Sequence, residues 1–469
     1  MTLLIDSLSK VYFCTGARNH ELLAPLSKNK LAFEYDERMA SFKALGFIKA
    51  QEAPVAVCTT SGTAVAECVP AMLEAYYSKL PLILISGDRP KKLHGTGAPQ
   101  TIEHELLTRG SRGSYFEMDL TEFLEFKMED VEYPVHINVL IDDTTSHDQK
   151  IIHHKNLAAF RDFLQVKKSP LFIFSHESRS MLPLVEKFTA LKIPFYAESM
   201  SGARHLSSLS SERDLVTLFN QGAFDCIIRI GHTPLTKIWR LLERNPLPVL
   251  NFDERGMPGL SFGEVLTYSS HDLLQSPIWW ETLSSFQTSP LVFESKDLGP
   301  LMEKYPESEI SLMRNLQNEL KEDDVIYLGN SLIIRFFELT QAKKFLIFGN
   351  RGVNGIDGQL ASAIGLAEGT KKTVYCILGD VTTLYDLSSM REMPGNLKLI
   401  IMNNKGGRIF DMLKLDKRIV MEHGLNFLDI SQGFKLKYTN DLKELDDTQV
   451  LELFPNQDHT ARFLQEWNS

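Results

Sequence analysis

Two apolar runs in the last third of the chain end in residues that can bind a metal ion. One run, residues 373–378, ends in a Gly-Asp pair, and the next, residues 397–402, ends in Asn-Asn-Lys-Gly-Gly. Apolar runs rich in β-branched residues predict buried parallel strands, and α/β proteins bind ligands at the carboxyl ends of such strands. There Asp380 offers a carboxylate, Asn404 an amide oxygen and Gly406 a backbone carbonyl. These hard oxygen ligands favour Mg²⁺ beside a diphosphate, although each piece alone is also ordinary turn chemistry.

A second candidate is the acidic pair Asp36-Glu37 at the start of a helical pattern. Asp36 suits an N-cap and Glu37 the first turn of a helix. Apolar residues then recur at three-residue steps and predict a buried helix face: Met39, Phe42, Leu45 and Ile48. Taken alone, the two acids only cap this helix and complement its dipole. Two segments that follow make these acids functional candidates. The first is a strand-like run with a hydroxyl-rich end at 55–63, and the second is Asp-Arg-Pro at 88–90.

Strand-like runs alternate with helical patterns along the whole chain, which is typical of parallel α/β units. The predicted strands form three groups: residues 11–14, 55–58, 82–86 and 135–141; residues 171–174, 226–230 and 249–252; and residues 325–328, 345–348, 374–378, 399–402 and 450–453. Helices are expected at 181–191 and 460–467, and a polar linker at 142–148. The sequence therefore predicts an α/β fold of three domains, each a mainly parallel sheet flanked by helices: residues 1–148, 149–290 and 291–469.

The composition narrows the class of protein. The chain has 469 residues, of which 43% are hydrophobic and 23% charged, enough to build a core in several domains. A net charge of −10 argues against nucleic-acid binding. No apolar run reaches the roughly 20 residues of a membrane span, and we expect no signal peptide. Five scattered cysteines without zinc-ligand spacing indicate reduced core thiols in a cytoplasmic protein.

The order of these motifs resembles the thiamine-diphosphate enzymes, in which Gly-Asp followed by Asn-Asn binds the metal and the diphosphate. Asp-Glu-Arg at 36–38, Thr-Ser-Gly-Thr at 60–63 and Asp-Arg-Pro at 88–90 resemble, more narrowly, the 2-succinyl-5-enolpyruvyl-6-hydroxy-3-cyclohexene-1-carboxylate synthase family of menaquinone biosynthesis. Further similar segments are residues 14–18, 97–102, 329–335, 350–358 and 409–410. The resemblance implies a pyrimidine-binding first domain, a shortened central domain and a diphosphate-binding third domain.

The resemblance also implies the cofactor contacts. Glu37 would hydrogen-bond the aminopyrimidine ring, and an apolar niche should raise the pKa of this carboxylate. Ile356 would lie beneath the bent cofactor, although core packing explains this residue equally well. Mg²⁺, with Mn²⁺ as a substitute, would be bound by Asp380, Asn404 and Gly406. The implied cofactor-binding residues are Ser61, Gly62, Gly355, Ile356, Gly379, Asp380, Asn404, Gly406, Gly407, Ile409 and Phe410.

The substrates implied by the resemblance are 2-oxoglutarate and isochorismate. The first would lose carbon dioxide, and the resulting succinyl carbanion would add to the ring alkene of the second. Both substrates are anionic and the chain is acidic, so local arginines must bind their carboxylates. The implied substrate-binding residues are Arg18, Arg89, Gln100, Ser331, Arg335, Arg351, Phe410 and Leu413. A homodimer or homotetramer with active sites at the subunit interface is implied as well.

Several residues depart from the family pattern. Ala17 stands where the family commonly has serine, Arg408 replaces a smaller or neutral residue, and the family's basic pair in the central domain has only Lys237 and Arg255 as candidates. Two other readings therefore stay open: another thiamine-diphosphate decarboxylase or carboligase acting on a smaller 2-oxo acid, and a non-catalytic relative that binds the cofactor. A dinucleotide-binding protein is disfavoured, because no Gly-x-Gly-x-x-Gly follows a predicted strand.

Overall fold

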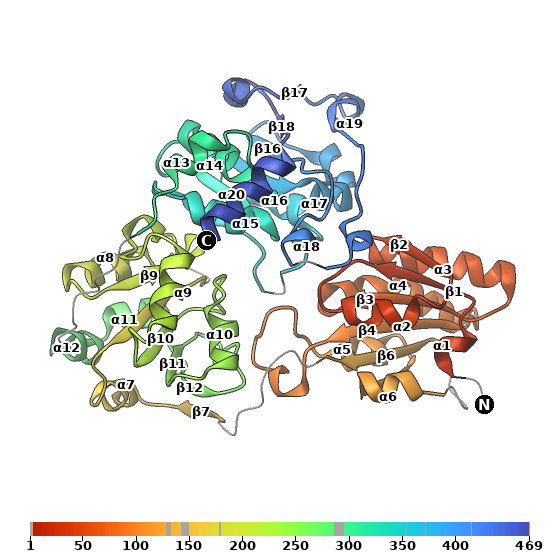
Figure 1. The fold of residues 1–469 in the computed structure, drawn as a ribbon, viewed down its shortest axis with the longest axis horizontal. Coiled ribbons are helices and arrows are strands. Elements are labelled where there is room, and N and C mark those ends of the chain that lie inside the picture. Colours follow the sequence, from red (N-terminus) through yellow and green to blue (C-terminus); the bar gives the residue numbers. More distant parts are fainter. Residues whose placement is uncertain are drawn as a thin grey trace.

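Three separate six-stranded sheets organise the chain. The computed structural model describes residues 3–127, 133–141, 150–177, 180–285, 295–352, 354–370, 372–413 and 415–468. Every pairing between named strands is parallel, and helices pack on the sheets, so the predicted α/β class is confirmed. Figure 1 shows the three sheets in three lobes, coloured red to orange, yellow to green, and teal to blue along the chain. The predicted linker at 142–148 lies outside the described residues.

The first sheet has the order β2-β1-β3-β4-β6-β5. Its strands are β1 (Lys10–Cys14), β2 (Leu31–Glu34), β3 (Val55–Thr60), β4 (Leu82–Asp88), β5 (Ser114–Asp119) and β6 (Val135–Leu140). Its helices are α1 (Leu4–Ser7), α2 (Leu23–Leu26), α3 (Glu37–Gln51), α4 (Thr63–Tyr77), α5 (His104–Gly110) and α6 (Leu120–Glu125), with short 3₁₀ turns η1 (His20–Leu22) and η2 (Lys91–Leu93). Every residue of β3 and β4 is buried, as expected for central strands covered on both faces.

The second sheet has the order β7-β12-β11-β10-β8-β9. Its strands are β7 (Ile151–His154), β8 (Pro170–Phe174), β9 (Phe195–Ala197), β10 (Cys226–Ile230), β11 (Val249–Phe252) and β12 (Gly263–Leu266). Its helices are α7 (Ala158–Leu164), α8 (Leu182–Ala190), α9 (Glu212–Asn220), α10 (Ile238–Arg244), α11 (Ser270–Gln275) and α12 (Pro277–Ser285), with η3 (Ser199–Ser201) and η4 (Arg204–Leu206). In Figure 1 this central lobe lies beside the orange loop of the first lobe.

The third sheet has the order β14-β13-β15-β16-β18-β17. Its strands are β13 (Val325–Leu328), β14 (Leu346–Phe348), β15 (Val374–Gly379), β16 (Leu397–Met402), β17 (Tyr438–Thr439) and β18 (Val450–Leu453). Its helices are α13 (Gly299–Lys304), α14 (Glu309–Glu319), α15 (Leu332–Thr340), α16 (Gln359–Thr370), α17 (Asp380–Tyr385), α18 (Ile409–Met412), α19 (Leu428–Gly433) and α20 (Gln457–Asn468), with η5 (Leu387–Glu392), η6 (Lys417–Val420) and η7 (Leu442–Asp447).

Each predicted group of strands falls in one sheet, and the four strands β10, β11, β13 and β18 have the predicted bounds. The helix expected at 181–191 is α8, and the one expected at 460–467 is the end of α20. The six strands that the sequence did not reveal are β2, β5, β7, β9, β12 and β17. The domain limits 1–148, 149–290 and 291–469 stay predictions.

The third lobe docks on the first through the segment around α18 and η6. Phe410, Leu415 and Ile419 pack with the first lobe's apolar core. The backbone N–H of Asp416 donates to His20 Nε2 (3.2 Å). Figure 1 shows α18 beside this lobe near β2. The carboxyl end of β15 also lies near the start of α3, because Tyr385, at the end of the helix that follows β15, contacts Glu37.

The cysteines behave as predicted, because all five are free and buried. Among the described helices, none combines the length and the apolar character that crossing a bilayer demands.

Candidate active site

Asp380 lies at the carboxyl end of β15, as the sequence predicts. β15 and β16 pair in parallel with Gly379 opposite Met402, so the two strands end at the same level. The Asp380 side chain is buried. Its Oδ1 accepts the N–H of Val381 (2.7 Å) and its Oδ2 accepts the N–H of Gly406 (2.9 Å). These hydrogen bonds join the two halves of the predicted metal motif.

Asn404 follows β16 and is also buried. Its side-chain N–H donates to Glu309 Oε2 (3.0 Å), whereas its Oδ1 accepts no hydrogen bond within the described residues. Because buried polar atoms nearly always have a hydrogen-bond partner or a metal ion beside them, we expect a partner for this oxygen. A divalent cation is such a partner, since Mg²⁺ takes oxygen ligands and keeps room for phosphate oxygens. The residues here therefore fit a metal-bound diphosphate.

Gly406 makes the turn that carries the third predicted ligand. Its φ of +138° is one that residues with a side chain rarely adopt, and a Cβ here would lie 2.8 Å from the Val420 carbonyl oxygen. The Gly406 carbonyl accepts the N–H of Arg408 (2.9 Å) and keeps a second lone pair for a metal. Within the described part of the chain, no three His, Cys, Asp or Glu side chains gather as a metal site. A metal here would depend on one carboxylate plus amide and carbonyl oxygens.

Two residues beside this motif were not found from the sequence. Burial raises the pKa of Glu309 to about 8; the hydrogen bond from Asn404 lowers it and nearby Asp380 raises it. His423 Nε2 lies 3.1 Å from Asp380 Oδ2. Glu309 is 95 residues away from Asn404 along the chain and resembles any acid in the first turn of a helix. Nothing in the linear pattern distinguishes it.

Glu37 begins α3, with Asp36 as the N-cap that accepts the N–H of Met39 (2.7 Å), as predicted. The Glu37 side chain is 7% exposed. Its Oε1 accepts from the Thr59 hydroxyl (3.4 Å) and its Oε2 from the Tyr385 hydroxyl (3.2 Å). Burial raises the pKa of Glu37 to about 7, although a backbone hydrogen bond and the Tyr385 hydroxyl oppose the rise. The expected rise in pKa is confirmed.

The Tyr385 contact brings the two predicted halves of the site together within one chain, because Tyr385 ends the helix that Asp380 begins. A second contact supports the first: the Thr63 hydroxyl donates to Asp357 Oδ1 (2.7 Å). Gly355 lies in the same contact, since a Cβ there would be 2.4 Å from Thr63 Oγ1. The Gly-Ile-Asp-Gly turn therefore packs on the hydroxyl-rich turn after β3.

The other predicted cofactor residues lie in the turns of both lobes. The Ser61 hydroxyl is buried and has no hydrogen-bond partner in the described structure, and the Gly62 N–H donates to His104 Nε2 (3.1 Å). Ile356 is half-buried, as is Ile409, which packs on the third lobe's core. The remaining member of the turn, Gly407, donates its N–H to the Val420 carbonyl (2.7 Å). The cofactor roles of these residues stay predictions.

The predicted substrate arginine of the first lobe, Arg89, is buried. Its Nε donates to the carbonyl of Pro99 (2.8 Å), which precedes Gln100. Its guanidinium lies 4.8 Å from the ring centre of Trp239 on α10, a residue of the central lobe that the sequence did not indicate. The backbone of Arg18 lies close to the end of β4, because a Cβ on Gly87 would lie 2.9 Å from the Arg18 carbonyl oxygen.

The predicted substrate residues of the third lobe form a second group. Arg335 Nη1 donates to the carbonyl of Ser331 (2.5 Å), and Arg351 Nη1 donates to Asn330 Oδ1 (2.5 Å). Asn330 in turn donates to the carbonyl of Gly355 (2.6 Å), which ties Arg351 to the cofactor turn. Burial, together with the neighbouring charge of Arg335, lowers the pKa of Arg351 to about 9. Leu413, expected in an apolar wall with Phe410, is 43% exposed.

The residues that depart from the family pattern have structural partners. Arg408 Nε donates to the Asn404 carbonyl (3.0 Å), and its Nη1 donates to Asp411 and Glu422, so the extra cation braces the turn. Arg255 Nη2 lies 3.2 Å from His232 Nε2. The backbone N–H of Lys237 donates to Glu212. Ala17 is exposed.

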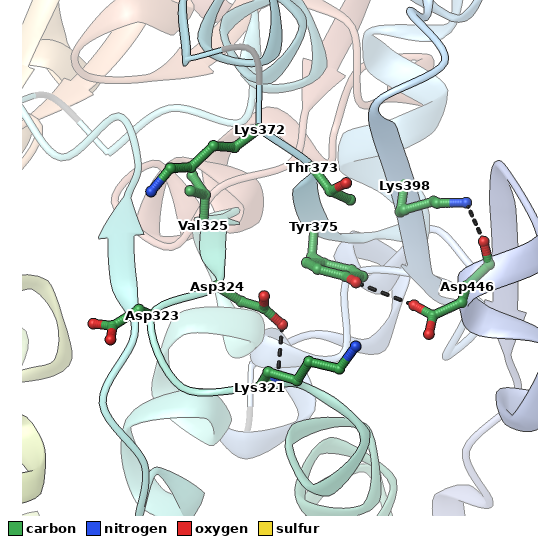
Figure 2. A pocket seen from close by; sticks show the side chains of 9 residues that line it. All are labelled: Lys321, Asp323, Asp324, Val325, Lys372, Thr373, Tyr375, Lys398 and Asp446. Carbon is green, nitrogen blue, oxygen red and sulfur yellow. Dashed lines mark hydrogen bonds between the residues drawn. The ribbon is translucent and has the colours of Figure 1, made fainter.

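A cavity of about 500 Å³ lies elsewhere, at the amino ends of β13, β15 and β16 (Figure 2). There the Tyr375 hydroxyl donates to Asp446 Oδ1 (3.2 Å), and Lys398 Nζ donates to the carbonyls of Asp446 and Thr448. Because ligands of α/β sheets bind at the opposite, carboxyl ends of the strands, we do not assign the active site to this cavity.

Comparison with known proteins identifies the family. Residues 2–107 match the family described as "Thiamine pyrophosphate enzyme, N-terminal TPP binding domain". A 2-succinyl-5-enolpyruvyl-6-hydroxy-3-cyclohexene-1-carboxylate synthase from Bdellovibrio bacteriovorus is 32% identical, with the alignment covering 97% of this chain and 94% of the relative. The chain belongs to this synthase family. A synthase of the same name from Akkermansia muciniphila is 30% identical over 96% of this chain and 93% of its own length.

Among solved structures, benzoylformate decarboxylase from Polynucleobacter necessarius aligns with 96% of this chain and 96% of its own, at 16% identity and a TM-score of 0.45. That overlap is too loose to bear on function. Family membership makes this chain a thiamine-diphosphate-dependent enzyme.

Proposed function

We propose that the chain decarboxylates 2-oxoglutarate and adds the four-carbon unit to isochorismate, giving 2-succinyl-5-enolpyruvyl-6-hydroxy-3-cyclohexene-1-carboxylate. The observation that carries this proposal is the contact between buried Glu37, with its pKa near 7, and the helix that begins at Asp380. When bound, thiamine diphosphate supplies the electron sink that a 2-oxo acid needs in order to lose carbon dioxide. Similarity to synthases of this name over nearly the whole chain supports the substrate assignment.

The residues would divide the work as follows. Asp380, Asn404 and Gly406 would hold Mg²⁺ or Mn²⁺, because their oxygens suit a hard cation. Glu37 would hold or release a proton at the pyrimidine ring, and a pKa of about 7 suits proton exchange near neutrality. The arginine groups of the first and third lobes would bind the substrate carboxylates, since the guanidinium fork matches them in a bidentate way.

We also propose a homodimer or homotetramer, with active sites between subunits, on the resemblance to the family. The first and third lobes touch through a few polar pairs and one apolar segment, and such contacts form equally well between two chains that exchange lobes. The five buried free cysteines support a reducing compartment, and we place the protein in the cytoplasm.

The test is turnover of purified protein with thiamine diphosphate and Mg²⁺, followed by mass spectrometry of the product. We expect 2-oxoglutarate to be consumed together with isochorismate, and pyruvate to be left unchanged. Use of pyruvate with no use of 2-oxoglutarate would favour the decarboxylase of a smaller 2-oxo acid. Cofactor binding without any turnover would favour the non-catalytic relative.

Glu37→Gln is the matched variant for this assay. It keeps the size of the side chain and removes the exchangeable proton, so we expect turnover to fall by at least about a hundredfold, the usual contribution of a general acid–base group. The diphosphate anchor is untouched, so calorimetry should show nearly unchanged cofactor affinity. Near wild-type turnover in this variant would contradict the role given to Glu37.

A further inference from the structure

Neighbouring asparagines after β16 are held in two different ways. Asn403 donates its side-chain N–H to buried Glu452, and its Oδ1 accepts the N–H of Lys405 (3.2 Å). Asn404 donates its side-chain N–H to buried Glu309 (3.0 Å), but its Oδ1 receives no hydrogen bond in the described parts of the chain. The first amide is thus fully used inside the protein. The second is fixed on its nitrogen side only, and its oxygen is kept available.

Glu309 is held firmly where it meets Asn404. It is the first residue of α14, Ser308 caps that helix by accepting from the Ser311 N–H (3.1 Å), and the Glu309 N–H donates to Thr460 Oγ1 (2.9 Å). The Glu309 side chain is 1% exposed. A carboxyl group with so little freedom presents its oxygen to Asn404 in one geometry. Its second oxygen, Oε1, has no hydrogen-bond partner among the described residues.

An amide side chain can present either its N–H₂ or its oxygen, and the hydrogen-bond network decides which. Rotating the Asn404 amide by half a turn would take its N–H₂ away from the Glu309 carboxyl oxygen and leave this donor buried without that acceptor. Leaving a buried donor or acceptor unpaired is costly, so Glu309 selects one orientation. In that orientation the Asn404 oxygen points away from Glu309.

We propose that Glu309 is a positioning residue that sets the orientation of the metal ligand Asn404. This inference rests on the proposed function, because it presumes that the Asn404 oxygen binds the cation of the cofactor. Partners that orient a metal ligand from behind usually affect metal affinity by about tenfold to a hundredfold. Glu309 would act only through Asn404 and would touch neither substrate nor cofactor.

The experiment measures Mn²⁺ binding by electron paramagnetic resonance, with thiamine diphosphate present. We expect Glu309→Met, which removes the acceptor, to weaken Mn²⁺ affinity by about tenfold or more. Glu309→Gln keeps an acceptor oxygen and should restore affinity to within about threefold of wild type. Glu309→Leu, which also removes the acceptor but is shorter than Met, serves in the same way if the Met variant does not fold.

A double-mutant cycle separates positioning from a general structural effect. If Glu309 acts through Asn404, Glu309→Met should cause no further loss in an Asn404→Ala background. Glu452→Gln alters the parallel pair at Asn403, and it should lower the thermal midpoint of the apoprotein without changing Mn²⁺ affinity.

The results distinguish the inference from the proposed function. Unchanged Mn²⁺ affinity in Glu309→Met, or an equal loss with and without Asn404, would overturn the inference alone. Failure of the wild-type chain to bind Mn²⁺ in the presence of thiamine diphosphate would overturn the proposed function, and the inference with it.

Discussion

At the scale of single residues, the site depends on carboxyl groups that are taken out of water. Glu37 is buried with two hydroxyl donors, and burial raises its pKa to about 7. Asp380 is buried as well, but two backbone N–H groups donate to its oxygens. The different environments agree with the different roles that we propose, proton exchange for Glu37 and cation binding for Asp380.

The pKa of Glu37 makes a prediction about stability and pH. Between the unfolded pKa of about 4.5 and the folded pKa of about 7, only the folded state holds this proton, so wild-type stability falls as pH rises through that window. The difference of about 2.5 pH units corresponds to about 3 kcal/mol. We expect apo Glu37→Gln to gain thermal stability relative to the wild type from about pH 5 to about pH 7 and no more above. A difference in thermal midpoint between the two proteins that does not change with pH would contradict a buried Glu37 with a raised pKa.

Asp380→Ala tests the metal ligand. It removes the only carboxylate of the predicted ligand set, so Mg²⁺-dependent binding of thiamine diphosphate should weaken by at least about tenfold in calorimetry. Asp411→Ala is the control, because Asp411 lies in α18, just after Asn404 and Gly406, but pairs with Arg408, which retains Glu422 as a second partner. Unchanged affinity in the Asp380 variant, or equal losses in both variants, would remove Asp380 from the metal shell.

At the scale of elements, the sequence revealed most of the central strands and missed most of the edge strands. β3, β10 and β18 are buried at every position, and a continuous apolar run predicts such strands well. By contrast, β2 and β7 are edge strands without a fully buried residue, and β17 has two residues. Such strands owe their conformation to pairing with a neighbour, which a local pattern does not contain.

The same limit applies to the candidate site. Residues in turns directly after strands, such as Asp380 and Asn404, could be predicted because strand ends place them at one edge. Residues that reach the site from distant elements could not be predicted. Glu309, Tyr385 and Trp239 reach the site from helices whose patterns indicate only ordinary packing. The family resemblance identifies the motifs, but it does not show which side chains from other elements contact them.

Helix α10 links the central lobe to the predicted substrate site, because Trp239 stacks on Arg89. We expect Trp239→Leu to raise the KM for at least one substrate by about twofold to thirtyfold, since a cation–π contact contributes about 0.5–2 kcal/mol. The kcat should change less, because Arg89 itself is retained. Trp280→Leu is the matched control: that ring lies 4.2 Å from Lys187 in the same lobe, away from Arg89. Equal changes in KM in both variants would indicate that Trp239 contributes only to the stability of the central lobe.

At the scale of the whole molecule, the three lobes have separate tasks. The first contains Glu37, the proposed proton-exchanging acid, the third contains the proposed metal ligands, and the central lobe contacts the first through Trp239 and through Thr233, whose hydroxyl donates to the Gly97 carbonyl (3.1 Å). The acid and the metal motif come from lobes separated by the whole central lobe along the chain. Their contact can therefore form within one chain or between two chains. The two cases predict different activities for dimers that combine two different inactive variants.

Mixing two inactive variants, Glu37→Gln and Asp380→Ala, decides between these cases. If active sites lie between subunits, each mixed dimer holds one site with both defects and one site with none. Random pairing makes half of the dimers mixed, so about a quarter of wild-type activity should return. We expect this recovery when the variants are co-expressed. The control mixes Asp380→Ala with Asn404→Ala, which share a lobe and should not complement in either case. A mixture of the first pair that stays inactive would place each active site within a single chain.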